Sequence, residues 1–115
     1  MFRFESLDIW HLARQYCVDV YRVVDEFPQK VQYSLGSQLR SSVLSVSNNI
    51  AEGSGSSSKQ EFKNFLNYST RSLYETVSAL FVARDNGYVS SEVFDKIYAD
   101  SELLVKKIRA FRNSL

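Results

Sequence analysis

The middle of the chain contains the sequence SVSNNIAEG at residues 45–53 and SKQEFKNFL at residues 58–66. Gly53 suits the left-handed conformation that commonly follows the last turn of a helix, because glycine adopts a positive φ without steric cost. Ser58 and Glu61 fit the S-x-x-E capping box, which satisfies two unpaired donors at the start of a helix. The stretch therefore predicts two helices joined by a short polar turn.

The segment before this hairpin has the apolar spacing of a helix that faces a core. Its apolar residues recur at alternating spacings of three and four, which places them on one helical face. We expect this helix at residues 7–27, with Ser6 capping its start. Pro28 ends it, because the residue before a proline is pushed out of the helical region. The stripe consists of Trp10, Ala13, Cys17, Val20, Val24 and Phe27.

The rest of the chain follows the same pattern. We expect the second helix to begin at residues 31–34, and the serine-glycine segment 53–58 to be a loop. The third helix stops at Gly87, and Ser90 or Ser91 caps the fourth, which continues to the end of the chain. Four helices, short connections and no strand pattern predict an all-α fold, specifically an antiparallel up-down-up-down four-helix bundle.

Composition and charge limit the classes of function that this protein can have. A chain of 115 residues fits one domain, so we expect a single four-helix-bundle domain at residues 1–115. The formal net charge of +1 argues against a strong overall field toward nucleic acid or an anionic membrane. No apolar run approaches the ~18 residues that a membrane helix needs, and no secretory signal is visible. We therefore expect a cytoplasmic protein that does not contact a membrane.

The chain offers few groups for catalysis or metal binding. His11 is the only histidine, so a histidine-pair metal site cannot form within one chain. Cys17 has no partner for an internal disulfide, and its place in the apolar stripe predicts a small buried hydrophobe. Gly53, Gly55 and Lys59 do not match a phosphate-binding loop, because the preceding strand is missing and the spacing is wrong. We expect no cofactor, no metal and no enzymatic activity.

Pairing across the central hairpin follows from the helical rise of about 1.5 Å per residue. If the two middle helices are antiparallel, Ser42 lies opposite Ser69, and Arg40 lies close enough to Glu75 for an ion pair. The many serines of the second helix indicate close approach to another helix or, alternatively, a polar surface that binds a ligand. Near the turn, we expect Glu52 to accept hydrogen bonds from backbone donors at the start of the third helix.

The charges are unevenly distributed along the chain. Residues 75–105 are predominantly acidic, whereas the segment after them carries four cations and no acid. Cations near a helix C-terminus complement the helix dipole, so this segment is either a solvated helix end or a phosphate-binding patch. In a ring of copies such a patch would be multiplied, and a small net charge per chain would be compatible with nucleic-acid binding. The four cations are Lys106, Lys107, Arg109 and Arg112.

Several motifs in the chain resemble a known protein family. They are QLR at residues 38–40, NIAEG at 49–53, EFKNFL at 61–66, SLYE at 72–75 and GYV at 87–89. They resemble the small four-helix-bundle proteins encoded in bacterial 23S rRNA intervening sequences, to which the accessory variability determinant of diversity-generating retroelements is related. The resemblance covers nearly the whole chain. It implies a four-helix bundle, assembly into a ring-shaped homopentamer, and a role in binding RNA or DNA, which in the retroelement relatives accompanies binding to a reverse transcriptase.

Two functions follow as hypotheses. The first is a non-enzymatic, homo-oligomeric scaffold that binds RNA or DNA electrostatically. The second is a protein-interaction adaptor, for example to a reverse transcriptase, without nucleic-acid contact. The cations predicted to act in the first are Arg40, Lys59, Lys63, Arg71, Lys106, Lys107, Arg109 and Arg112. The motif residues predicted to be structural are Asn49, Glu52, Gly53, Ser72 and Glu75.

Overall fold

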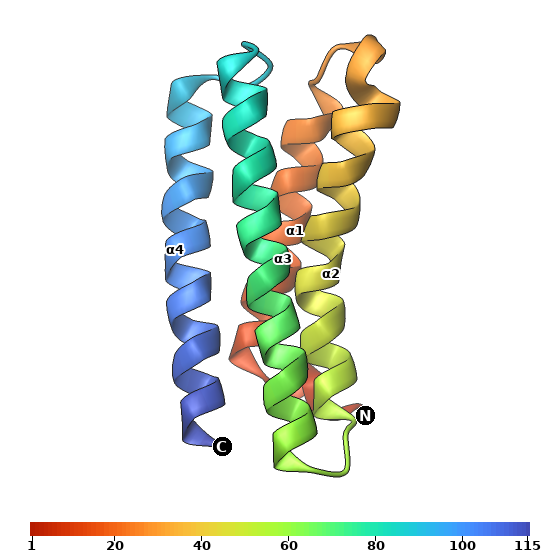
Figure 1. The fold of residues 1–115 in the computed structure, drawn as a ribbon, viewed down its shortest axis with the longest axis vertical. Helices are drawn as coiled ribbons and strands as arrows, with labels where there is room; N and C mark the ends of the chain where they lie inside the picture. Colours follow the sequence, from red (N-terminus) through yellow and green to blue (C-terminus); the bar gives the residue numbers. More distant parts are fainter.

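The computed structural model describes all residues from 1 to 115, which form a helical structure without strands (Figure 1). A short 3-10 turn at Arg3–Ser6 precedes the first long helix. A second 3-10 turn at Gln29–Val31 and a π-helical segment at Gln32–Gly36 lead into the second long helix. The predicted all-α four-helix bundle is confirmed. Its long helices are α1 (Asp8–Asp25), α2 (Ser37–Ser54), α3 (Lys59–Asp85) and α4 (Ser91–Ser114).

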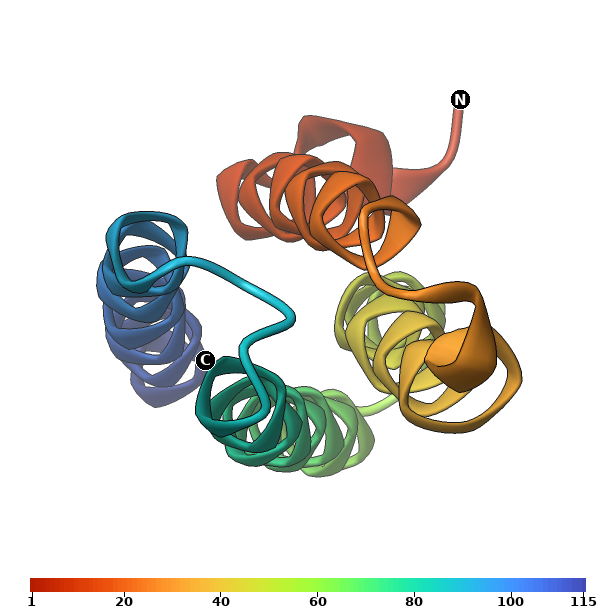
Figure 2. The same ribbon diagram turned by 90° about the horizontal axis from the view of Figure 1, so that it is seen from above.

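Each long helix packs against its neighbours in the chain, and α4 also packs against α1. The helices therefore surround one core, as Figure 2 shows from above. The chain reverses direction at each connection (Figure 1), so the end of α4 lies at the same end of the bundle as the beginning of α3. The bundle is 43 Å long. None of its helices combines the length and the apolar character needed to span a lipid bilayer.

The ends of α3 and α4 follow their sequence signals. The Ser58 hydroxyl accepts a hydrogen bond from the backbone N–H of Glu61 at 3.1 Å, which is one half of the predicted capping box. The Ser90 hydroxyl caps α4 in the same way by accepting from the backbone N–H of Val93 at 3.2 Å. Gly87, just after α3, has φ +75°. Glycine is suited to this position because it adopts the left-handed conformation without strain.

The start of α1 differs from the prediction. Ser6 does not cap the helix, because it belongs to the preceding 3-10 turn and its hydroxyl donates to the backbone oxygen of Arg3 at 2.9 Å. Leu7 stands at the cap position in an extended conformation. At its other end, α1 stops at Asp25, a few residues before Pro28, close to the predicted boundary.

Gly53 is a packing residue within α2, so its predicted role as a left-handed helix end is wrong. The helix continues through Ser54, and the only positive φ in the chain is that of Gly87. A Cβ atom on Gly53 would lie 2.7 Å from Cβ of Phe65 and 2.8 Å from Cδ1 of Phe62, both on α3. Glycine is required here because it lacks a side chain, which lets α2 and α3 meet.

Replacing Gly53 with alanine should destabilise the fold. Alanine gains about 1 kcal/mol in helix propensity, but overpacking a rigid contact costs about 1–3 kcal/mol. The difference is a net loss of up to about 2 kcal/mol in the free energy of unfolding of Gly53→Ala, measured by urea denaturation. Gly55→Ala is the matched control, because its Cβ would meet no atom nearer than 3.5 Å and its φ is −86°. Equal stability of the two variants would contradict the packing role of Gly53.

Small polar residues bring α2 and α3 into close contact. The Ser42 and Thr76 hydroxyl oxygens are 2.8 Å apart, and the Ser69 hydroxyl donates to the backbone oxygen of Val46 at 2.7 Å; all four residues are buried. The predicted close approach is confirmed, but the pairing of Ser42 with Ser69 is wrong. Helical side chains lean toward the N-terminus of their own helix. Across an antiparallel pair, Ser42 therefore reaches a residue farther along α3 than backbone rise alone predicts.

One hydrogen-bonded pair in the core joins α1 to α4. The hydroxyl of the buried Tyr16 lies 2.6 Å from that of Ser101, which itself donates to the backbone oxygen of Ile97 at 2.7 Å. Tyr16 is therefore the donor to Ser101. Burial raises the pKa of Tyr16 to about 12. Cys17 is buried as predicted, and burial raises the pKa of its thiol.

The raised pKa of Tyr16 should make the fold sensitive to alkaline pH. Its pKa is 10.0 without the protein environment and about 12 in the fold. The unfolded chain thus loses this proton first, and the stability that the neutral phenol contributes is present below pH 10 and is lost between pH 10 and 12. The total decrease in the free energy of unfolding is about 2–3 kcal/mol.

Thermal unfolding between pH 8 and pH 11 measures this effect. We expect Tyr16→Phe to reduce the alkaline decline in stability, because the variant has no phenol to ionise. Tyr33→Phe is the control, because Tyr33 is 86% exposed. Identical declines in the wild type and both variants would show that Tyr16 does not govern the alkaline transition.

Candidate nucleic-acid interface

Three of the eight predicted cations lie around one cavity between α3 and α4. The cavity has a volume of about 460 Å³, and no acidic side chain lines it. We call it the arginine cleft. Its lining residues are Asn67, Thr70, Arg71 and Tyr74 from α3, and Arg109 and Arg112 from α4.

Helical periodicity explains why these residues meet. Positions 67, 70, 71 and 74 are three or four residues apart, so they form one stripe on α3 beside the core positions Leu66 and Leu73. Arg109 and Arg112 are one turn apart on α4. Because successive helices run in opposite directions (Figure 1), the last turns of α4 pass the first half of α3. The two stripes therefore face the same cavity.

The sequence pattern predicted the three arginines but not Asn67, Thr70 and Tyr74. Their spacing from Arg71 was the available signal, because it places all four residues on one side of α3. That signal does not tell which side of α3 is covered by α4. Only the packing of the two helices identifies this stripe as the lining of a cleft.

Neutral groups hold two of the three guanidinium groups. Arg112 donates to Oδ1 of Asn67 at 2.5 Å and to Oδ1 of Asn113 at 3.1 Å, and Arg109 donates to the Tyr74 hydroxyl at 3.0 Å. The ion pairs of the chain involve none of the three arginines. A guanidinium group has five N–H donors, so most of their donors remain free. The arginines of the cleft therefore form no ion pair with a carboxylate, although Glu102 lines a second cavity that Arg109 shares.

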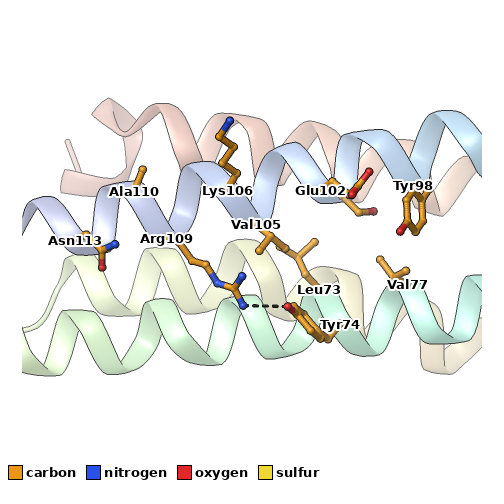
Figure 3. Close-up of a pocket in the computed structure, with 11 residues that line it drawn as sticks. Leu73, Tyr74, Val77, Tyr98, Glu102, Val105, Lys106, Arg109, Ala110 and Asn113 are labelled. Atoms are coloured by element: carbon orange, nitrogen blue, oxygen red, sulfur yellow. Dashed lines mark hydrogen bonds between the residues drawn. The ribbon is translucent and has the colours of Figure 1, made fainter.

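A more apolar groove of about 700 Å³ continues from the arginine cleft along α3 and α4 (Figure 3). Tyr74 and Arg109 line both cavities, and the Arg109 guanidinium lies 5.7 Å from the centre of the Tyr74 ring. Lys106 also lines the groove, but its amine points away from Arg109 (Figure 3). The apolar part of the lining includes Leu73, Val77, Tyr98 and Val105.

The other predicted cations lie outside both cavities. Lys59 and Lys63 occupy the first turns of α3, and Lys107 is exposed on α4. None of these three lysines lines the cleft or the groove. Arg40 lies near the start of α2, at the opposite end of the bundle from the last turns of α4 (Figure 1). The predicted cations therefore do not form one continuous surface.

Arg40 stabilises the connection between α1 and α2. Its guanidinium lies 3.5 Å from a carboxylate oxygen of Asp25 and donates to the side-chain oxygen of Gln32 at 2.5 Å. The Gln32 amide in turn donates to the backbone oxygen of Val24 in the last turn of α1, at 2.8 Å, and to that of Phe27 just after the helix, at 3.0 Å. The expected ion pair with Glu75 is wrong. Equal height along the bundle does not determine the helix face, and Arg40 faces the end of α1.

The motif residues that were predicted to be structural differ in their contacts. The Asn49 amide donates to a backbone oxygen one turn earlier in α2 at 2.8 Å, and the Ser72 backbone oxygen accepts from a hydroxyl one turn later in α3 at 2.8 Å. Glu52 and Glu75 are exposed and form no ion pair. The expected cap of α3 by Glu52 is wrong, because Ser58 occupies that role.

The surface outside the cleft shows no cluster of metal ligands. No group of three or more His, Cys, Asp or Glu side chains is arranged to hold a metal ion. The exposed His11 has its two ring nitrogens beside the backbone oxygen of Glu5, at 2.6 Å, and the guanidinium of Arg14, at 3.2 Å. The arginine cleft is therefore the best candidate for a binding site.

The fold and the cleft define a small helical-bundle protein with an arginine-lined cavity between its last two helices. Residues 5–110 match the model of a family described as 23S rRNA-intervening sequence protein. This match covers most of the chain, which therefore belongs to the 23S rRNA-intervening sequence protein family, as the resemblance of its motifs predicted. No curated protein matches the chain.

Proposed function

We propose that this protein is a cytoplasmic, homo-oligomeric scaffold that binds RNA or DNA through phosphate groups at the arginine cleft. The observation that carries the proposal is the convergence of three arginines, without an acidic partner, on one cavity. Arginine binds phosphate strongly because its guanidinium presents parallel N–H donors. The family description refers to 23S rRNA, which makes ribosomal RNA the first ligand to test.

The cleft and its surroundings combine charge with aromatic surface. Tyr74 is 59% exposed and Tyr68 is 45% exposed. The Arg71 guanidinium lies 5.7 Å from the centre of the Tyr68 ring. Unpaired bases stack on exposed aromatic rings, so this arrangement suits single-stranded segments and loops. In this proposal the three arginines contact phosphates at the cleft. Four lysines that do not line the cleft add positive charge in the same half of the bundle: Lys59, Lys63, Lys106 and Lys107.

We propose further that several copies assemble into a ring, with a pentamer as the favoured form. A single chain with a net charge of +1 attracts a polyanion weakly. Several clefts in one assembly act together and raise the overall affinity. Large apolar side chains that remain exposed provide surface for contact between copies, among them Leu12 on α1 and Leu103 on α4.

Binding of 23S rRNA fragments should depend on salt and on the arginine cleft. We expect the double variant Arg71→Gln/Arg112→Gln to lower affinity at least tenfold at low salt. Because each lost phosphate contact removes about 0.7–0.9 from the slope of log affinity against log salt, the slope should fall by about 1.5. The control Arg22→Gln/Lys30→Gln removes the same charge from exposed positions at the other end of the bundle. Filter binding across a salt series measures all three proteins.

Two outcomes would contradict this function or its location. Equal losses in the two double variants would indicate dispersed electrostatic attraction without a role for the cleft. If neither RNA nor DNA is retained at micromolar protein and low salt, the hypothesis of nucleic-acid binding is excluded. The protein-interaction adaptor then becomes the better hypothesis.

Light scattering on the purified protein tests the assembly. We expect a mass about five times that of the 13.2 kDa chain, because a ring brings together the clefts of several chains that each have a low net charge. The measurement should be repeated over a range of protein concentrations without nucleic acid. A mass equal to one chain at every concentration would contradict the ring.

A further inference from the structure

The arginine cleft carries more positive charge than one backbone phosphate can neutralise. Three guanidinium groups line it, and no carboxylate does. An internal phosphodiester of a nucleic acid carries a single negative charge. A terminal phosphomonoester carries about −1.5 to −2 charges at pH 7 and presents three acceptor oxygens. The charge of the cleft therefore matches a phosphorylated strand end better than the interior of a strand.

The groups that orient the arginines leave this charge intact. Arg112 is held between the amide oxygens of Asn67 and Asn113, and Arg109 is held by the phenol of Tyr74. An aspartate in place of either asparagine would accept the same hydrogen bonds but would cancel one positive charge. The cleft thus has oriented donors together with an unneutralised charge. This arrangement favours an anionic ligand, because the arginine side chains that are already held lose less conformational entropy when it binds.

The adjoining groove provides a place for a base next to that phosphate. Tyr74 and Arg109 line both the cleft of about 460 Å³ and the groove of about 700 Å³. The hydrogen bond from Arg109 fixes the orientation of the exposed Tyr74 ring at their junction (Figure 3). Val77 and Val105 continue the apolar surface beyond this ring. A terminal nucleotide is complementary to this arrangement, because its dianionic phosphate stands beside an aromatic base.

We propose that the arginine cleft and groove bind the terminal nucleotide of a nucleic-acid strand through its phosphomonoester. This deepens the proposed function, on which it rests for the polymeric ligand. A free mononucleotide tests the cavity independently. The terminal phosphate can stand at the 5′ or the 3′ end of a strand, and the experiment distinguishes the two.

The test compares single-stranded oligoribonucleotides of one sequence that carry a 5′-phosphate, a 3′-phosphate or hydroxyl groups at both ends. Fluorescence anisotropy with the full chain should show at least tenfold tighter binding of one phosphorylated form. Asn67→Asp keeps the acceptor for Arg112 and adds a negative charge, so it should abolish this preference. Asn48→Asp is the matched control, because Asn48 is exposed on α2 and lines neither cavity. The control should keep the full preference.

A titration with adenosine 5′-monophosphate, monitored by NMR on the same proteins, tests nucleotide binding by the cavity separately from RNA binding by the protein. If RNA binds with equal affinity whatever its ends carry, the inference is overturned and RNA binding stands. If the mononucleotide binds to the wild type and not to Asn67→Asp, while no RNA binds, the cavity is a nucleotide site, but the proposed function and the binding of a strand end are both overturned. Inorganic phosphate that binds as tightly as the mononucleotide would overturn the role of the groove.

Discussion

The fold depends on the close packing of α2 against α3, which a glycine and a few small polar residues permit. Gly53 leaves the space that Phe62 and Phe65 occupy, because any Cβ at that position would overlap them. Farther along the same interface, the hydroxyls of Ser42 and Thr76 bond to each other within the core. Serine is a mediocre helix former, so these residues reduce helix propensity in exchange for a short distance between helices. The other two helices pack around this central pair.

The candidate site lies at the less extensive interface between α3 and α4. The contact between α3 and α4 is less extensive than that between α2 and α3, and both cavities lie along it. Longer side chains such as Tyr74, Arg109 and Arg112 extend into this space and bond across it. The closely packed pair of α2 and α3 thus supports the neighbouring interface, at which we propose that a ligand binds. Rigid support matters because a binding site requires side chains held in a defined arrangement.

The net charge of +1 conceals a local imbalance. The acidic residues of the second half of the chain precede the basic segment that ends α4, and antiparallel packing brings this segment beside the early turns of α3. Arg71 therefore faces Arg109 and Arg112, and the only groups that hold these arginines are neutral. At a distance beyond a Debye length of about 8–10 Å the overall charge is screened. In the proposed function, recognition of a phosphate at contact distance therefore depends on the local cluster.

The sequence alone predicts the four helices, the cap at Ser58, a cap of α4 at Ser90 or Ser91, the turn at Gly87 and the family. These features depend on local spacing and backbone conformation, which the order of residues encodes directly. Packing between helices explains the glycine at position 53, the partner of Arg40 and the position of Asn67 and Tyr74 beside the arginines. Each of these depends on which helix faces meet and on the direction in which side chains lean across the contact. Helical periodicity places residues on a common stripe, but packing of the whole core decides what that stripe faces.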